Sequence, residues 1–290
     1  MARKKTTKKS SNRDPERADR NKRIMIGGAI IIGAGAVFVG AAMGIGELDR
    51  RAAEFIMSTN PPVVIDWPTD VQGTTWMPMI ERERIQTQLA RAVQGGKALS
   101  RAPLEEAGLA LMRSGWIEGT PRVRWTSEGK IEVQAHWRVP VAAVRVGTRE
   151  IVIDRQRHAL PLDYNIGQSN QLYFVHVDAR QPAIGEQWRG TDIEDGLELL
   201  FVLEEENLLE QVAGFDLGQG EKSGTIRIIT TRNSKIIWGA GPGRERPGEV
   251  PTSVKTGRLK IFYEKTGLID GGFQYIDISG PTMTKMRAEG

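Results

Sequence analysis

The sequence contains no cysteine, which excludes disulfides and thiolate metal sites. Histidine is scarce, and His136, His158 and His176 do not have the spacing of metal ligands. No HExxH, GxSxG or Walker pattern occurs anywhere in the chain. The sequence therefore predicts no metal site, no cofactor and no catalytic residue, and the protein is expected not to be an enzyme.

Two stretches resemble chemical sites only superficially. Residues 239–244 are rich in glycine, but they lack the Lys-Ser/Thr of a phosphate loop, and Pro242 has no N–H for an anion. A plain turn is the better interpretation. Residues 204–206 are three glutamates on an expected helix, where they spread around the axis and favour a solvated face. A membrane-tethered envelope enzyme with widely scattered site residues stays open as a further hypothesis.

The sequence has no catalytic or metal-site motif, but it does contain one long apolar run. Residues 24–46 carry no charge, and a helix rising about 1.5 Å per residue would cover the hydrocarbon core of a bilayer over that length. Residues 1–23 contain ten Lys or Arg against three Asp or Glu. Since basic flanks stay in the cytoplasm, we expect a cytoplasmic tail over 1–23, a transmembrane helix over 24–46 and export of the remainder. A cleaved signal peptide is the alternative, but its apolar region and basic leader are usually shorter.

The same run suggests a contact between helices. Gly40 and Gly44 form a GxxxG pair that would let another membrane helix approach closely, which would support weak self-association. Glycine is also simply common in membrane helices. Residues 24–290 sum to −3 against a total of +4, so the basic character belongs to the tail and no nucleic-acid partner is expected.

The sequence pattern of the exported part predicts two groups of helices and strands. The first has the order strand, helix, helix, strand, strand, over residues 63–65, 79–94, 103–114, 122–125 and 131–138. In the second, Thr191 and Glu194 predict a capping box before a helix that ends near residue 207. Further strands are predicted over 211–217, 225–231, 235–238 and 273–279, with a helix over 254–265.

The order of the first group, after a membrane anchor, resembles a POTRA domain, and residue motifs extend the resemblance to the FtsQ/DivIB cell-division family. A Trp-hydrophobic pair ends the second helix, a Val-x-Arg-x-Trp-like strand follows, and a Pro-Val-Ala closes the next strand. These motifs fall on Trp116, Ile117, Trp125, Pro140, Val141, Ala142 and Asp154. No proline follows Trp125, and Arg157-His158 stands where the family has glycine. The motif residues are expected to be mainly structural.

The resemblance implies an α+β fold class: a single transmembrane helix, a POTRA-type β-α-α-β-β domain and a second mixed, mainly β domain. The implied boundaries are a stalk over 47–60, the POTRA-like domain over 61–147, the β domain over 148–281 and a tail over 282–290.

The resemblance also implies a function. The protein would be a non-enzymatic, bitopic scaffold of the bacterial divisome in the cell inner membrane, with its C-terminal domains in the periplasm at the division septum. Its partners would be bitopic proteins similar to FtsB and FtsL, bound by strand addition at Tyr275, Ile276, Asp277, Ile278 and Ser279. The alternative for this strand is an ordinary core strand. The alternative function is an envelope chaperone or transport adaptor with a POTRA domain that binds polypeptides by strand addition.

Overall fold

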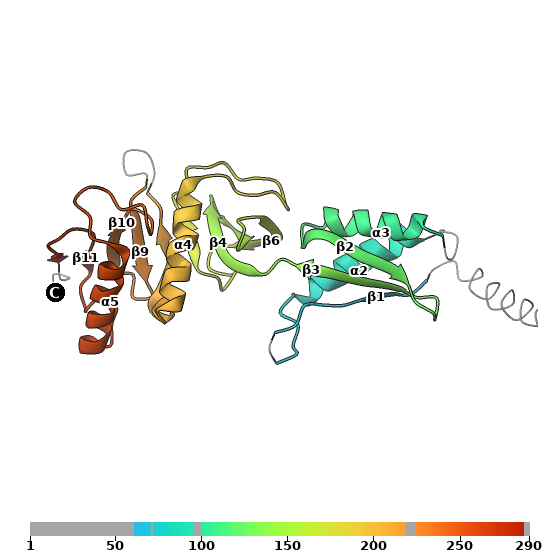
Figure 1. The fold of residues 1–290 in the computed structure, drawn as a ribbon, viewed down its shortest axis with the longest axis horizontal. Helices are drawn as coiled ribbons and strands as arrows, with labels where there is room; N and C mark the ends of the chain where they lie inside the picture. The colour runs from blue at the N-terminus through green and yellow to red at the C-terminus, as the bar shows by residue number, and fades with distance from the viewer. Residues whose placement is uncertain (1–60, 71, 95–99, 219–223, 287–290) are drawn as a thin grey trace, which may run out of the picture. The chain divides into compact units, whose positions relative to one another are not determined.

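A computed structural model describes residues 61–70, 72–94, 100–218 and 224–286, and its strands form two sheets (Figure 1). The smaller sheet has three strands in the order β1-β3-β2, with β1 parallel and β2 antiparallel to the central β3. Its elements follow one another as β1 (Val63–Ile65), α2 (Met79–Val93), α3 (Ala102–Arg113), β2 (Ile117–Trp125) and β3 (Ile131–Trp137).

Hydrophobic periodicity explains these elements. In α2 the buried residues Ile85, Leu89 and Val93 recur at helical spacing, and they face the same core as the buried stripe of α3. In β3, Ile131 and Val133 are buried and alternate with more exposed polar residues. The two helices predicted from the sequence are therefore present and cover one face of this sheet.

The larger sheet is mixed and has nine strands in the order β12-β11-β10-β9-β8-β7-β4-β5-β6. Its elements are β4 (Pro140–Val146), β5 (Arg149–Asp154), β6 (Ala159–Asn165), β7 (Tyr173–Val175), α4 (Thr191–Glu205), the 3-10 turn η1 (Leu209–Gln211), β8 (Val212–Asp216), β9 (Ile226–Thr230), β10 (Lys235–Gly239), α5 (Thr252–Thr266), β11 (Tyr275–Asp277) and β12 (Thr284–Met286).

Both helices of this sheet are crossover connections. Parallel neighbours cannot be joined by a tight turn, and α4 connects the parallel pair β7 and β8, while α5 connects the parallel pair β10 and β11. Figure 1 shows α4 and α5 against the strands of the sheet. Leu197, Leu200 and Leu203 of α4 enter the same core as Leu259 and Phe262 of α5.

The expected fold class needs correction, because its transmembrane helix is not found among the residues that the structure describes. Among the residues that the structure describes, none of the helices combines the length and the apolar character needed to cross a bilayer. The tail over 1–23, the predicted span over 24–46 and the stalk over 47–60 lie outside the described residues. The second group is mixed, with two helices of 15 residues each beside its nine-stranded sheet.

The expected boundaries also need correction. β4 pairs with β5 and β7 in the large sheet, so this sheet begins at Pro140, inside the range that the sequence assigned to the first domain. At the other end, β12 lies within the predicted tail over 282–290. Both errors have one cause: strand pairing decides which sheet a short strand joins, and the residue pattern within the strand does not show it.

The predicted capping box does not form at α4. Gly190 occupies the N-cap with a φ of 142°, and no side chain caps the helix there. The Glu194 carboxylate is bound instead by Arg157 and Arg244 at 3.1 and 3.2 Å. Arginine partners from distant parts of the chain have therefore replaced the local hydrogen bond.

Candidate functional site

The predicted partner-binding strand is internal to the large sheet. β11 pairs with β10 on one side and with β12 on the other, and Ile276 and Ile278 are fully buried. The Asp277 carboxylate accepts hydrogen bonds from the N–H and the hydroxyl of Ser279 at 2.8 and 2.6 Å, which closes the strand end. The expectation that residues 275–279 form an exposed edge is therefore corrected, because β12 already occupies that edge.

The open margin lies one strand further along the chain. β12 is the last strand of the nine in the described sheet, and all three of its side chains are exposed. Lys285 lies with its ammonium 5.2 Å from the ring centroids of both Phe262 and Phe273, which attaches the strand to the core. Met286 is 60% exposed beside it. A short strand with an unoccupied side is the arrangement to which another chain can add.

Arg258 of α5 holds the turn that leads to β12. Its Nη1 donates hydrogen bonds to the carbonyl oxygens of Ile278 and Gly280 at 2.8 and 2.6 Å, and its Nη2 donates to the carbonyl of Pro281 at 2.9 Å. A planar guanidinium can satisfy several acceptors in a fixed geometry. The residues between β11 and β12 are thus fastened to a rigid helix, which positions the edge strand.

At the opposite margin of the sheet the backbone is partly covered. Ala159 of β6 donates its N–H to the carbonyl of Glu186 at 3.0 Å and accepts a hydrogen bond from the N–H of Gly185 at 2.7 Å. The two margins therefore differ, and β12 is the better candidate for binding a partner strand.

The motif residues of the family resemblance lie mostly in cores. Trp116 is fully buried, and its Nε1–H donates to the Glu81 carboxylate at 3.1 Å. Trp125 donates its Nε1–H to the carbonyl of Ser100 at 3.1 Å. The buried Asp154 binds Arg138 at 2.5 Å. Ile117 and Ala142 are buried, whereas Pro140 and Val141 are partly exposed. Gly40 and Gly44 lie outside the described residues.

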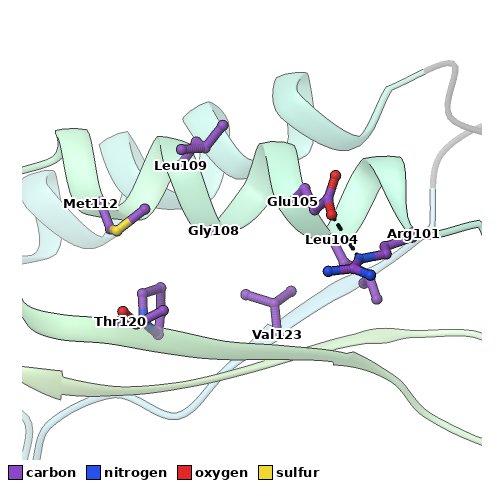
Figure 2. Close-up of a pocket in the computed structure, with 9 residues that line it drawn as sticks. Arg101, Leu104, Glu105, Gly108, Leu109, Met112, Thr120 and Val123 are labelled. Atoms are coloured by element: carbon purple, nitrogen blue, oxygen red, sulfur yellow. Dashed lines mark ion pairs between the residues drawn. The ribbon is translucent and has the colours of Figure 1, made fainter.

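A second surface feature was not recognised in the sequence. An apolar groove of about 480 Å³ runs between α3 and β2, and Figure 2 shows the side chains that face it. Leu109 and Met112 of α3 are 40% and 43% exposed there, although most large apolar side chains of this helix-covered sheet are buried. The groove is lined by Arg101, Leu104, Glu105, Gly108, Leu109, Met112, Thr120, Pro121 and Val123.

The floor of this groove is an edge strand. β2 ends the smaller sheet in the described part of the chain, and Val123 approaches the helix closely enough that a Cβ on Gly108 would lie 4.0 Å from it. Arg101 and Glu105 form an ion pair of 2.7 Å at one end of the groove (Figure 2). A helix beside an open strand edge suits an extended peptide, whose alternate side chains would enter the groove. The sequence offers one indication of this groove, because the apolar stripe of α3 is wider than the sheet can cover.

The glycine-rich run 239–244 is a turn held by carboxylates. Arg244 contacts Asp195 of α4 at 2.7 Å, and a Cβ on Gly241 would lie 2.4 Å from the Asp195 carboxyl carbon. Burial raises the pKa of the Asp195 carboxyl, while Arg244 opposes that effect and the charge of Glu198 adds to it. Arg244 is thus already neutralised by α4, which leaves the turn no cation for a phosphate.

No cluster of three or more His, Asp or Glu side chains in the described ranges could hold a metal ion. Comparison with known proteins adds no relative: no protein-family model matches the sequence, and no curated protein is significantly similar to it. The FtsQ/DivIB resemblance therefore stays a prediction. The geometry itself offers two open strand edges, each with exposed apolar side chains nearby.

Proposed function

We propose that the protein is a non-enzymatic scaffold of the kind that the FtsQ resemblance implies, recruiting partner proteins of the bacterial divisome through its folded part. The observation that supports this proposal is the exposed terminal strand β12, fastened by Arg258 and unpaired on its outer side within the described sheet. Strand addition needs such an edge, and main-chain hydrogen bonds would provide much of the affinity.

The partners we propose are small division proteins similar to FtsB and FtsL. Such a partner would extend the nine-stranded sheet by one strand along β12. Met286 would offer an apolar contact at the edge, and the Lys285 stem would remain over Phe262 and Phe273. Residues 275–279 would support the edge strand from behind instead of contacting the partner backbone.

Proline substitutions along β12 test this mechanism in the full-length chain. Successive N–H groups of a strand point to opposite sides, so one of Lys285→Pro and Met286→Pro removes a donor from the outer edge. We expect at least one of the two variants to lose co-purification of the small division proteins from membranes. Lys285→Ala is the matched control, because it keeps the N–H and removes only the side chain. Full capture by both proline variants would reject the β12 edge.

The second candidate function is an envelope chaperone or transport adaptor that binds polypeptides by strand addition, and the groove between α3 and β2 supports it. Met112→Glu would place a charge in this groove without disturbing the buried stripe of α3. If the chaperone function holds, this variant loses binding to unfolded envelope proteins while the β12 proline variants retain it. The opposite pattern supports the scaffold.

Placement in the cell inner membrane, with the N-terminus in the cytoplasm, stays a prediction from residues 1–46, which lie outside the described residues. Septal localisation of a fluorescent fusion would test the divisome assignment. A uniform distribution in dividing cells would contradict it.

A further inference from the structure

A polar pocket of about 530 Å³ lies beside the turn between β5 and β6. This volume is in the range of small-molecule sites in proteins. His158 contributes one wall of the pocket, and the loop that follows β7 contributes the rest. The residues of the loop that line the pocket are Ala179, Arg180, Pro182, Gly185, Glu186, Gln187 and Arg189.

Backbone hydrogen bonds hold both walls together. In addition to the two bonds of Ala159 described above, the N–H of Trp188 donates to the carbonyl of Arg157 at 2.7 Å. The Gln187 side chain donates to the carbonyl of Gln156 at 3.0 Å, and Trp188 fixes the start of the loop by donating its Nε1–H to Ala179 at 3.2 Å. The pocket is therefore preformed, which lowers the entropy lost when a ligand binds.

Two arginines at this pocket have no partner within the described residues. Arg180 and Arg189 line it, both are exposed, and neither side chain makes an ion pair or hydrogen bond with the rest of the described chain. Arginines nearby are engaged: Arg157 pairs with Glu194, and Arg155 stacks on the ring of Phe201. The one carboxylate of the lining, Glu186, accepts a hydrogen bond from the N–H of Ala183 at 3.2 Å.

His158 is held at the pocket through its Nδ1. Its Nδ1 lies 2.5 Å from Nη1 of Arg138 and 3.2 Å from the Asp154 carboxylate. Nδ1 thus lies between a guanidinium, which can only donate, and a carboxylate, which can only accept, and these contacts hold the ring in place at the pocket wall. Nε2 has no hydrogen-bond partner in the described part of the chain. The His158 ring therefore lines the pocket beside its two guanidinium groups, with Nε2 unengaged in the described part of the chain.

We propose that this pocket binds a small ligand through an oxyanion, either a carboxylate or a phosphate, held by Arg180 and Arg189 with the His158 ring beside it. Planar guanidinium groups bind both oxyanions through paired hydrogen bonds. The neutral part of the ligand lies against Ala179 and Pro182, and the Gln187 amide offers it one further polar contact.

The three histidines provide a direct readout. Nuclear magnetic resonance of the imidazole Cε1–H groups in the full-length chain would give one signal each for His136, His158 and His176. The His158 signal is assigned by its loss in His158→Gln. At constant ionic strength, titration with inorganic phosphate or with acetate should shift the His158 signal to saturation and leave the other two unchanged. Saturation by phosphate alone or by acetate alone identifies which oxyanion the site prefers.

Charge variants distinguish a specific oxyanion site from general electrostatic attraction by the positive charges of the protein. Arg180→Gln and Arg189→Gln should each weaken binding by about tenfold or more, because each removes a charge-assisted pair. Arg155→Gln is the matched control: it lies on the turn that carries His158, removes the same charge and does not line the pocket. Three results would overturn the proposal: no shift with either anion, equal shifts of all three histidines, or an equal loss of affinity in Arg155→Gln.

Discussion

Lys255 of α5 is fully buried and forms an ion pair of 2.8 Å with Glu249 in the segment before the helix. The ammonium also lies 5.3 Å from the ring centroid of Trp238. The Glu249 carboxylate accepts further hydrogen bonds from the N–H of Ala240 at 3.1 and 3.2 Å. It lies so close to β10 that a Cβ on Gly239 would be 2.6 Å from one of its oxygens. This pair joins the end of β10 to α5.

Removing the two charges separately and together should have unequal effects. Glu249→Met leaves a buried ammonium without an anion, and breaking a buried pair in this way costs about 3–5 kcal/mol. Lys255→Met should cost less, about 1–3 kcal/mol, because the Glu249 carboxylate is partly hydrated and keeps the N–H of Ala240. In the double variant neither charge is left alone, so its loss should be smaller than the sum of the single losses by about 2 kcal/mol or more.

Urea unfolding of the four proteins, followed by circular dichroism, measures these differences as shifts in the midpoint at constant slope. The key comparison is between Glu249→Met and the double variant, because the second substitution should restore stability. Additive losses, or a double variant no more stable than Glu249→Met, would refute the view that the two buried charges neutralise each other.

Three further outcomes follow from the contacts described. Trp116→Ala should lower the free energy of unfolding by about 3–5 kcal/mol in thermal or urea unfolding, since it leaves a cavity and removes the donor to Glu81; a near-neutral result would contradict the packing of the smaller sheet. The hydrogen bond from the Thr252 side chain, with backbone N–H donors, lowers the pKa of Glu245 from 4.5 to about 2. The stabilisation by the Glu245 carboxylate is therefore fully present above about pH 4.5 and is lost as the pH falls toward 2. The free energy of unfolding, measured over this pH range, should fall less in Glu245→Gln than in the unchanged protein. Identical pH profiles would refute the lowered pKa of Glu245. Arg258→Ala should increase amide exchange in residues 278–286 and weaken partner capture. Arg258→Lys keeps the charge but not the planar set of guanidinium donors, so it should restore exchange protection and partner capture only in part.

Local pattern was sufficient for the helices. The four α-helices of the described residues lie within about three residues of their predicted ends, although the capping box that predicted the start of α4 does not form. The buried alternation of β3 was equally visible, because one face of that strand contacts the helices and the other contacts water. For these elements the local sequence alone indicates which residues are buried and which are exposed.

Sheet membership was not visible in the same way. Ile276 and Ile278 predict a strand, but nothing in that stretch shows that residues 284–286 fold back to cover it. The exposed sequence Thr-Lys-Met has no apolar alternation, so β12 gives no strand signal of its own. For the pocket at His158, the convergence of Arg180 and Arg189 depends on a loop folding onto a turn more than twenty residues earlier in the chain. Contacts of this kind depend on tertiary structure and leave no periodicity to find.

The strand order of the large sheet has a consequence for biosynthesis. β4 is the first of its strands to be synthesised, β5 and β6 extend the sheet on one flank, and β7 to β12 then extend the other flank one after another in chain order. Synthesis therefore proceeds outward from β4, the third strand from one margin, and β12, the strand proposed for docking, is the last of the described strands to be made. A nascent chain still short of residue 284 has no such strand, so recruitment would be reserved for chains in which the whole sheet has been made.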